Sequence, residues 1–329
     1  MAARFAVVVT DDRYGDYSEE RAVLEEVGAG LEVRNFTTED EAIEGLRDAD
    51  GVLVNLFQMS RRVIEALPKC RVLSRYGVGF DNVDVGAATE RRIWVARVPD
   101  YSIEDVSDQA LALLLACVRG VAYKDRGVRQ GRWNMQKDVP TRRVAGKVLG
   151  LVGYGAIARC LHRKVSGLGL SRVLVHDPYV EADAVHDAGA EPVDLGSLVV
   201  EADFISVHVP LGPQTRGMIS EPVLRRMKPT AILVNTSRGP VIDERALAEA
   251  LAAHRIAGAG LDVFETEPLD RANPLLRLEN VVLSDHTGWY SQESVPELKT
   301  KAARNVAAVL SGGKPVYPVN DIGSQATPR

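Results

Sequence analysis

The chain has 329 residues, of which 46% are hydrophobic and 26% are charged, and its formal net charge is −5. A chain of this length exceeds the roughly 250 to 300 residues that one hydrophobic core serves, so we expect two globular domains. The basic residues are scattered, which argues against nucleic acid as a partner, and no apolar run approaches the roughly 20 residues of a membrane span, so we expect a cytoplasmic protein.

Apolar runs alternate with amphipathic stretches along the chain, which is the pattern of parallel sheets flanked by helices. In the first hundred residues we expect strands at Phe5–Val9, Leu31–Arg34, Gly51–Val54, Val72–Ser74 and Ile93–Val95. The segment Ile103–Arg119 is rich in Leu, Ala and Val without strand-like alternation, and Ser102 before two acids gives it a helix start. We expect one long, largely buried helix here and place the main domain boundary near Ser102.

A second series of strands and helices begins at Val148. Its six expected strands are Val148–Val152, Val173–His176, Phe204–Val207, Ile232–Asn235, Ala257–Asp262 and Val281–Leu283. Six consecutive strands predict a nucleotide-binding sheet. A final helix is expected over Glu293–Leu310, and periodicity does not tell which domain it joins.

The strongest local motif is a glycine-rich turn after the first strand of this series. Gly153, Gly155 and Ala158 form G-x-G-x-x-A between an apolar strand and a helix, the context that a dinucleotide fingerprint requires. Gly153 permits the tight turn, Gly155 lets the backbone approach a pyrophosphate, and Ala158 lets helix and strand pack. The N–H groups at the helix start then meet the phosphates. The alternative is an ordinary glycine turn.

An acid at the end of the next strand indicates which dinucleotide binds. Asp177 lies twenty-four residues beyond Gly153, close to where a carboxylate binds the ribose hydroxyls and repels a 2′-phosphate. We therefore predict NAD rather than NADP. The alternative for Asp177 is a turn residue before Pro178.

Three ionisable residues follow later strands, at the sheet edge where ligands bind in open α/β folds. Alone, Arg238 is a solvated charge, Glu267 a turn acid and His286 a loop histidine. Together they form the set that hydride transfer to a 2-oxo acid needs, with His286 moving the proton, Glu267 orienting its imidazole, and Arg238 holding the substrate carboxylate. The set requires no metal. His208, at the end of another strand, is expected to line the cofactor.

Seven segments, taken in order, resemble the D-isomer-specific 2-hydroxyacid dehydrogenases. They are RYGVGFDNVDV, VGYGAIA, VHDPY, HVPLGPQTRGMI, NTSRGPVIDERAL, AGLDVFETEP and DHTGWYS. The resemblance implies an NAD-dependent oxidoreductase that moves a hydride between nicotinamide and a small 2-oxo or 2-hydroxy acid. It implies two Rossmann-like or flavodoxin-like, doubly wound parallel-sheet domains with a cleft between them. The substrate domain would comprise residues 1–101 and 289–329, the NAD-binding domain residues 102–288, and two copies would form a homodimer through the latter.

The resemblance also assigns site residues by motif. The catalytic residues are Arg238, Glu267 and His286. Asp262 would hold the nicotinamide carboxamide, and the N–H groups of Val78 and Gly79 would receive the substrate carboxylate. Cofactor contacts are expected from Val78, Gly153, Tyr154, Gly155, Ala156, Ile157, Asp177, His208, Val209, Pro210, Thr215, Thr236, Ser237, Arg238, Asp262, His286, Gly288 and Trp289. Substrate contacts are expected from Leu56, Tyr76, Val78, Gly79, Arg238 and Trp289.

Within the family, the combination of D-P-Y with H-T-G-W-Y-S looks most like the branch of the C-terminal binding proteins, which are NADH-responsive corepressors as well as dehydrogenases. The loop over residues 54–57 lacks the arginines of the phosphoglycerate-oxidising branch. Leu56, Phe57, Tyr76 and Trp289 predict a pocket more aromatic than a glyoxylate reductase needs. Two other functions stay open: an NADH-sensing interaction protein, and a relative acting on a phosphonate or phosphite, for which Arg75 is the candidate cation.

Overall fold

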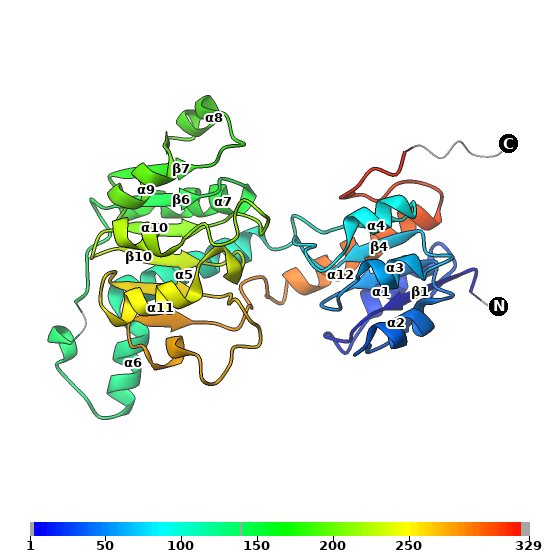
Figure 1. Cartoon of the computed structure of the whole chain (residues 1–329), viewed down its shortest axis with the longest axis horizontal. Coiled ribbons are helices and arrows are strands. Elements are labelled where there is room, and N and C mark those ends of the chain that lie inside the picture. The colour runs from blue at the N-terminus through cyan, green and yellow to red at the C-terminus, as the bar shows by residue number, and fades with distance from the viewer. Residues whose placement is uncertain (1–2, 139, 324–329) are drawn as a thin grey trace. The chain divides into compact units, whose positions relative to one another are not determined.

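The computed structural model describes residues 3–138 and 140–323. The chain divides into two compact units, which we call unit 1 (Met1–Ser102 and Ser291–Arg329) and unit 2 (Ile103–Tyr290). Each unit is built on its own parallel sheet with helices packed against it (Figure 1). The prediction of two parallel-sheet α/β domains is confirmed.

Unit 1 contains a five-stranded sheet in the order β2-β1-β3-β4-β5. Its strands are β1 (Phe5–Val9), β2 (Ala29–Val33), β3 (Gly51–Val54), β4 (Val72–Arg75) and β5 (Trp94–Ala96). Its helices are α1 (Ser18–Glu25), α2 (Glu39–Leu46), α3 (Arg61–Glu65), α4 (Val85–Glu90) and α12 (Ser294–Leu310). Every neighbouring pair of strands is parallel, so the carboxyl ends of the strands share one edge.

The last helix, α12, belongs to unit 1 although it follows all of unit 2 in the chain. Hydrogen bonds from distant residues hold it against the sheet. Ser74 Oγ on β4 donates to the Ala302 carbonyl at 2.9 Å, and Asn305 Nδ2 donates to the Arg97 carbonyl at 3.1 Å. Unit 1 is therefore completed by a segment that no local pattern assigns to it.

Unit 2 contains a seven-stranded parallel sheet in the order β12-β11-β10-β9-β6-β7-β8. Its strands are β6 (Val148–Val152), β7 (Arg172–His176), β8 (Glu191–Pro192), β9 (Phe204–Val207), β10 (Ile232–Asn235), β11 (Gly258–Leu261) and β12 (Val281–Leu283). Its α-helices are α5 (Ile103–Arg119), α6 (Val121–Arg129), α7 (Ala156–Val165), α8 (Ala182–Asp187), α9 (Leu195–Glu201), α10 (Glu221–Arg226) and α11 (Glu244–Ala252). Short 3-10 turns are η1 (Met135–Lys137), η2 (Ser166–Leu168), η3 (Gly239–Val241) and η4 (Pro274–Arg277).

Both faces of the unit 2 sheet are buried, which explains why its strands read as nearly continuous apolar runs. Leu149 and Leu151 of β6 pack with side chains of α5 and α7 on one face. Val152 packs on the other face with side chains of α9, α10 and α11. The alternation of β6 side chains between two cores fixes helices on both sides, as a doubly wound sheet requires.

The sequence does not predict two features of unit 2. Strand β8 has only two residues, one of them Pro192, so it carries no periodic signal and adds a seventh strand at the sheet edge where six are predicted. Helix α6 begins after Gly120, whose φ is 61°, and it bends by 63° from α5. Within the described residues no single helix is long and apolar enough to cross a membrane, and only α5 and α6 taken as a bent pair meet that length and composition.

The strand order places the candidate site. From β6 the chain moves outward to β7 and β8, and then returns to β9 on the opposite side of β6. The carboxyl ends of β6 and β9 therefore flank the point where the order reverses, which is where open α/β sheets bind ligands. Gly153 follows β6 and His208 follows β9, so both lie at this point.

Candidate active site

The turn after β6 is closely packed at its first glycine and open at its second. Gly153 has a φ of 88°, and a Cβ there would lie 2.9 Å from the backbone carbon of His208. Only glycine combines this conformation with this approach. A Cβ on Gly155 would have no described atom within 4 Å, its chain neighbours left aside. The backbone of Gly155 therefore faces space that a bound group can fill.

The start of α7 fits the pyrophosphate of a dinucleotide. The helix begins at Ala156, directly after Gly155, and no side chain caps its first turn. Ten residues of helix give that end a partial positive charge. Thr236 follows β10, at the same edge of the sheet, and its buried Oγ1 makes no hydrogen bond to any residue that the structure describes. An open glycine, an uncapped helix start and an unpaired hydroxyl together fit a bound dinucleotide.

The acid predicted to bind ribose lies beside the glycine turn. Asp177 follows β7 and accepts hydrogen bonds from the N–H of Tyr154 at 2.8 Å and of Tyr179 at 2.9 Å. These bonds fix its carboxylate at the carboxyl edge of the sheet. The side chain of Tyr154 points the other way, into the core, where its hydroxyl lies 2.7 Å from His162 Nδ1.

The loop from Val209 to Thr215 is closed by its own hydrogen bonds. Thr215 Oγ1 donates to the Pro210 carbonyl at 2.6 Å and accepts from the Gly212 N–H at 2.9 Å. His208, just before the loop, lies 2.8 Å from Ser206 Oγ through its Nε2. Burial lowers the pKa of His208 to about 4, so this imidazole is neutral at pH 7 and offers hydrogen bonds rather than charge.

Arg238 is carried by a turn that buried polar groups shape. Asn235, at the end of β10, donates from Nδ2 to the Arg238 carbonyl at 2.9 Å and accepts from the N–H and hydroxyl of Ser237 at 3.0 and 2.8 Å. At the next residue, a Cβ on Gly239 would lie 1.9 Å from the carbonyl carbon and oxygen of Phe264. The Arg238 turn is therefore pressed against the segment that leads to Glu267.

Glu267 and His286 form a direct pair. Glu267 Oε2 lies 2.6 Å from His286 Nδ1, and Glu267 Oε1 accepts the Phe264 N–H at 2.9 Å. Burial opposes ionisation of Glu267, but the hydrogen bond and charge of His286, the Phe264 N–H and the charge of Arg238 outweigh it and hold its pKa below the ordinary value. The three predicted catalytic residues thus share one electrostatic neighbourhood, with Glu267 as the common partner.

His286 adopts an uncommon backbone conformation. Its φ is 56°, in the left-handed region that few residues other than glycine occupy and where histidine is enriched. Its N–H donates to the Asp262 carbonyl at 2.8 Å, and its own carbonyl accepts from Trp289 Nε1 at 2.9 Å. An uncommon backbone conformation that is fixed by the surrounding hydrogen bonds is often found at functional sites.

The carboxylate of Asp262 accepts several hydrogen bonds from the loop after β12. The donors are Ser284 Oγ at 2.6 Å, the Gly288 N–H at 2.9 Å and the Thr287 N–H at 3.2 Å. Burial raises its pKa, partly offset by these donors and by the charge of His286. A Cβ on Gly288 would lie 2.8 Å from Asp262 Oδ2, so glycine is needed there for the loop to close.

The candidate residues of unit 1 follow β3 and β4. Leu56 is 58% exposed, and its N–H donates to the Asp11 carboxylate. Val78 and Gly79 are half-buried in the turn after β4. Tyr76 differs from the expectation of a pocket side chain: it is 2% exposed and its hydroxyl donates to Glu20 at 2.8 Å. Its aromatic ring is therefore held in the interior, and a substrate contact from Tyr76 stays a prediction.

Sequence reasoning missed residues that support the candidate set. Asn235 shapes the Arg238 turn, and Ser284 donates to Asp262 while accepting from Gln109 Nε2 at 2.8 Å. A polar residue at the buried end of an apolar strand, as in I-L-V-N, was the available signal for Asn235. Nothing in the local sequence marks Gln109. Its partner, Ser284, follows β12 and is 175 residues away in the chain, so only the fold brings the two together.

The family model described as "D-isomer specific 2-hydroxyacid dehydrogenase, NAD binding domain" matches residues 111–288, over half of the chain. This span contains the glycine turn, Asp177, Arg238, Glu267 and His286.

Curated relatives and solved structures agree with this match. The chain is 44% identical over 282 residues to a glyoxylate reductase of Korarchaeum cryptofilum, covering 84% of this chain and 85% of the relative. It is 38% identical over 308 residues to a D-3-phosphoglycerate dehydrogenase of Methanocaldococcus jannaschii, covering 93% of this chain and 57% of that protein. A glyoxylate reductase structure from Paecilomyes thermophila superposes with a TM-score of 0.87 at 27% identity, over 97% of this chain and 99% of the other.

Proposed function

The chain belongs to the D-isomer specific 2-hydroxyacid dehydrogenase family, and from this premise we propose that it interconverts a small 2-oxo acid and its 2-hydroxy acid with NAD(H), using Arg238, Glu267 and His286. It is an NAD-dependent oxidoreductase acting on the CH–OH group of 2-hydroxy acids. The bound nicotinamide supplies or accepts the hydride. The remaining chemistry falls to side chains of the protein.

The observation that carries the residue roles is the Glu267–His286 hydrogen bond of 2.6 Å. Because Glu267 engages Nδ1, the other ring nitrogen, Nε2, is the one that meets the substrate. In reduction Nε2 donates a proton to the carbonyl oxygen, and in oxidation it accepts the proton of the hydroxyl. Glu267 fixes the ring orientation and stabilises the protonated imidazole.

We propose that Arg238 binds the substrate carboxylate; its Nη1 also donates to the Ser237 carbonyl at 2.8 Å. Its guanidinium offers paired N–H donors, which suit a 2-oxo acid's carboxylate and polarise the adjacent carbonyl. Its charge contributes to the lowered pKa of Glu267, which supports a position for Arg238 close to Glu267. The N–H groups of Val78 and Gly79 are proposed as the second carboxylate contact.

The structure supports a smaller substrate than the sequence suggests. Two of the four side chains expected to make the pocket aromatic are engaged inside unit 1: Tyr76 is buried on Glu20, and Phe57 stacks edge-on against Phe36 at 5.9 Å between ring centroids. Substrate contacts from Leu56 and from Trp289 stay predictions. We therefore favour glyoxylate or hydroxypyruvate over phenylpyruvate. The C-terminal binding protein-like branch stays a prediction.

NAD is preferred over NADP in this proposal because of Asp177. Its carboxylate is held at the end of β7 by two backbone N–H groups, so it cannot readily turn away from a 2′-phosphate. A negative charge fixed there repels the phosphate and accepts hydrogen bonds from ribose hydroxyls.

We also propose a homodimer formed through unit 2, in the cytoplasm as the sequence predicts. Figure 1 shows α6 and the turn after it projecting from the rest of unit 2. This projection carries three exposed apolar side chains, namely Val121, Val128 and Trp133, and Trp133 is 77% exposed. Apolar side chains gathered on a projecting segment favour a protein partner, and a second copy is the simplest one.

The experiment is NADH and NADPH oxidation by purified protein against glyoxylate, hydroxypyruvate, phenylpyruvate, 3-phosphohydroxypyruvate and phosphonopyruvate. We expect the highest kcat/KM with glyoxylate or hydroxypyruvate and a preference for NADH. A preference for phenylpyruvate would restore the aromatic pocket, and one for phosphonopyruvate would favour the phosphonate alternative with Arg75. Tight NADH binding without turnover of any acid would contradict the proposal and favour the sensing alternative.

A further inference from the structure

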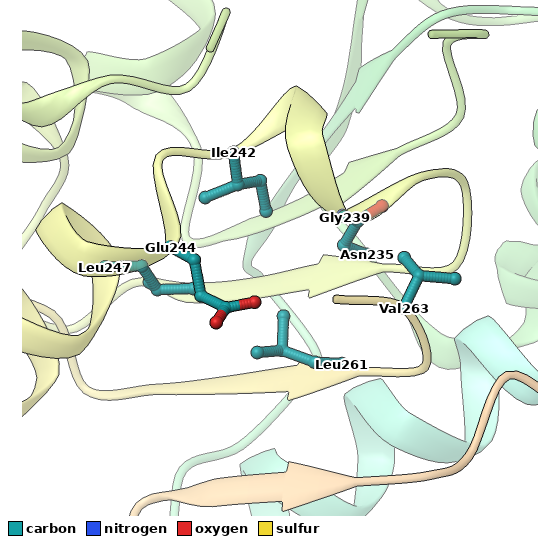
Figure 2. A pocket seen from close by; sticks show the side chains of 7 residues that line it. All are labelled: Asn235, Gly239, Ile242, Glu244, Leu247, Leu261 and Val263. Carbon is teal, nitrogen blue, oxygen red and sulfur yellow. The ribbon is translucent and has the colours of Figure 1, made fainter. Parts of the chain in front are cut away.

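Glu244, which no assigned role includes, points into a small cavity beside the Arg238 turn. It is the first residue of α11, and its carboxylate enters a cavity of about 10 Å³ that Figure 2 shows from close by. This is about the room of one water molecule. The other residues that line it are Asn235, Gly239, Ile242, Leu247, Leu261 and Val263.

Glu244 and Glu265 hold each other through reciprocal hydrogen bonds. Glu244 Oε2 accepts the Glu265 N–H at 2.9 Å, and Glu265 Oε1 accepts the Glu244 N–H at 3.2 Å. The second carboxylate oxygen of Glu244 accepts from Asn273 Nδ2 at 2.6 Å. Both carboxylate oxygens of Glu244 therefore serve the loop after β11 rather than the helix on which Glu244 lies.

Helix capping does not explain these bonds. The cap of α11 is Asp243, whose side chain accepts the Ala246 N–H at 2.9 Å. An acid in the first turn also suits the helix dipole, but that effect needs only the charge. The directed contacts with Glu265 and Asn273 need oxygen acceptors at fixed positions, which the helix dipole does not require.

The loop that Glu244 holds contains the partner of the proton donor. Glu265 follows Phe264, whose N–H donates to Glu267 at 2.9 Å, and Glu267 in turn contacts His286. The same short segment is pressed against Gly239, next to Arg238. One carboxylate thus joins the start of α11, which follows the Arg238 turn in the chain, to the loop that carries Glu267.

We propose that Glu244 is a positioning residue, which holds the loop after β11 so that Glu267 meets His286 Nδ1 and Arg238 faces the same substrate. It touches neither substrate nor cofactor and acts through Glu267. The inference rests on the proposed catalytic roles of Glu267 and His286.

The test compares Glu244→Ala, Glu244→Asp and Glu244→Gln with a matched control, Glu249→Ala. Glu249 lies on the same helix and pairs with Arg245 at 3.4 Å, with both side chains exposed. We expect Glu244→Ala to lower kcat by about tenfold to a hundredfold without changing NADH affinity, because small misplacements of catalytic groups cost that much. Glu244→Gln keeps an acceptor for the Glu265 N–H but sets an amide NH2 group against Asn273 Nδ2, so its kcat should lie between those of wild type and Glu244→Ala.

A positioning role makes a second prediction that a merely structural role does not. If Glu267 separates from His286, the pKa of Glu267 rises toward its ordinary value. The acid limb of the kcat/KM profile should therefore move to higher pH in Glu244→Ala. The Nδ1–H proton shared with Glu267 should give a downfield proton NMR resonance, assigned by its absence in His286→Ala. We expect this resonance in wild type, Glu244→Gln and Glu249→Ala, and its broadening or loss in Glu244→Ala.

The NMR measurement needs no turnover, so the two proposals can fail separately. An inactive wild type with the expected resonance changes contradicts the proposed function and leaves the positioning role supported. An unchanged resonance and pH profile in Glu244→Ala overturns the positioning role, as does a wild type without the resonance. Should Glu244→Ala not fold, Glu244→Asp, whose shorter side chain cannot reach both partners, replaces it with the same expectations.

Discussion

At the scale of single residues, His286 is the proposed proton donor and acceptor, and its contacts are well defined. Its Nδ1 faces Glu267, and its backbone is fixed by Asp262 and Trp289. The cofactor is expected to be held mainly by the turn after β6. We therefore expect His286→Ala to lower kcat by about a hundredfold to ten-thousandfold while the NADH dissociation constant stays near that of wild type.

The measurement is steady-state turnover with fluorescence titration of NADH. His186→Ala is the matched control, because His186 is an exposed histidine on α8 of the same unit. A parallel loss of NADH affinity and turnover in His286→Ala would remove His286 from the proton-transfer role.

His208 makes a prediction about stability rather than turnover. Its pKa is lowered by burial from 6.5 to about 4, so the unfolded chain binds this proton more tightly than the folded protein does. Stability is therefore fully present above pH 6.5 and is lost as pH falls from there toward 4. The loss between pH 7 and pH 5 is about 2 kcal/mol from this group.

Denaturant unfolding of the cofactor-free protein at pH 7 and pH 5 measures this loss. His208→Gln, which cannot become charged, should show a pH dependence smaller by about 2 kcal/mol. The same pH dependence in wild type and His208→Gln would mean that another group is responsible.

At the scale of elements, the contact between the Arg238 turn and the segment after β11 depends on Gly239. A Cβ there would overlap the Phe264 carbonyl at 1.9 Å, and backbone cannot move aside as a side chain tip can. We expect Gly239→Ala to lower the free energy of unfolding by about 2 kcal/mol or more and to abolish most activity, since both loops must shift.

Gly167→Ala is the control for this substitution. Gly167 lies in η2 of the same unit, and a Cβ there has no described atom within 4 Å. Thermal unfolding and turnover should be nearly unchanged in Gly167→Ala, and a Gly239→Ala protein with wild-type stability and activity would show that the two segments can separate freely.

At the scale of the whole molecule, the proposed homodimer is tested on the projecting α6 segment. Trp133 is the most exposed of its apolar side chains, and burying it against a second copy would remove a large apolar surface from water. We expect a dimer in wild type and a weakened dimer in Trp133→Asp, measured by sedimentation velocity at several protein concentrations.

Leu276→Asp serves as the comparison, because Leu276 is another exposed apolar residue of unit 2, at 48% exposure, but lies in η4. It should leave the dimer intact. A monomeric wild type, or a Trp133→Asp protein that associates as tightly as wild type, contradicts the assignment of this interface.

The sequence by itself determined the fold class, because buried parallel strands appear as short apolar runs and their helices as amphipathic stretches, and both patterns are local in the sequence. Strands β1, β3, β6, β9, β10 and β12 and helix α5 have the bounds that the sequence predicts. It also determined the family and the identity of the candidate catalytic residues, because motifs at strand ends are local in sequence.

Only the tertiary structure decided which distant groups meet. It buried Tyr76 on Glu20 and joined Glu244 to the loop before Glu267. These hydrogen bonds join residues that are far apart in the sequence, so neither hydrophobic periodicity nor motif spacing predicts them. Strand β8 was missed for the related reason that two residues on a sheet edge are stabilised by their neighbour β7 and not by their own pattern.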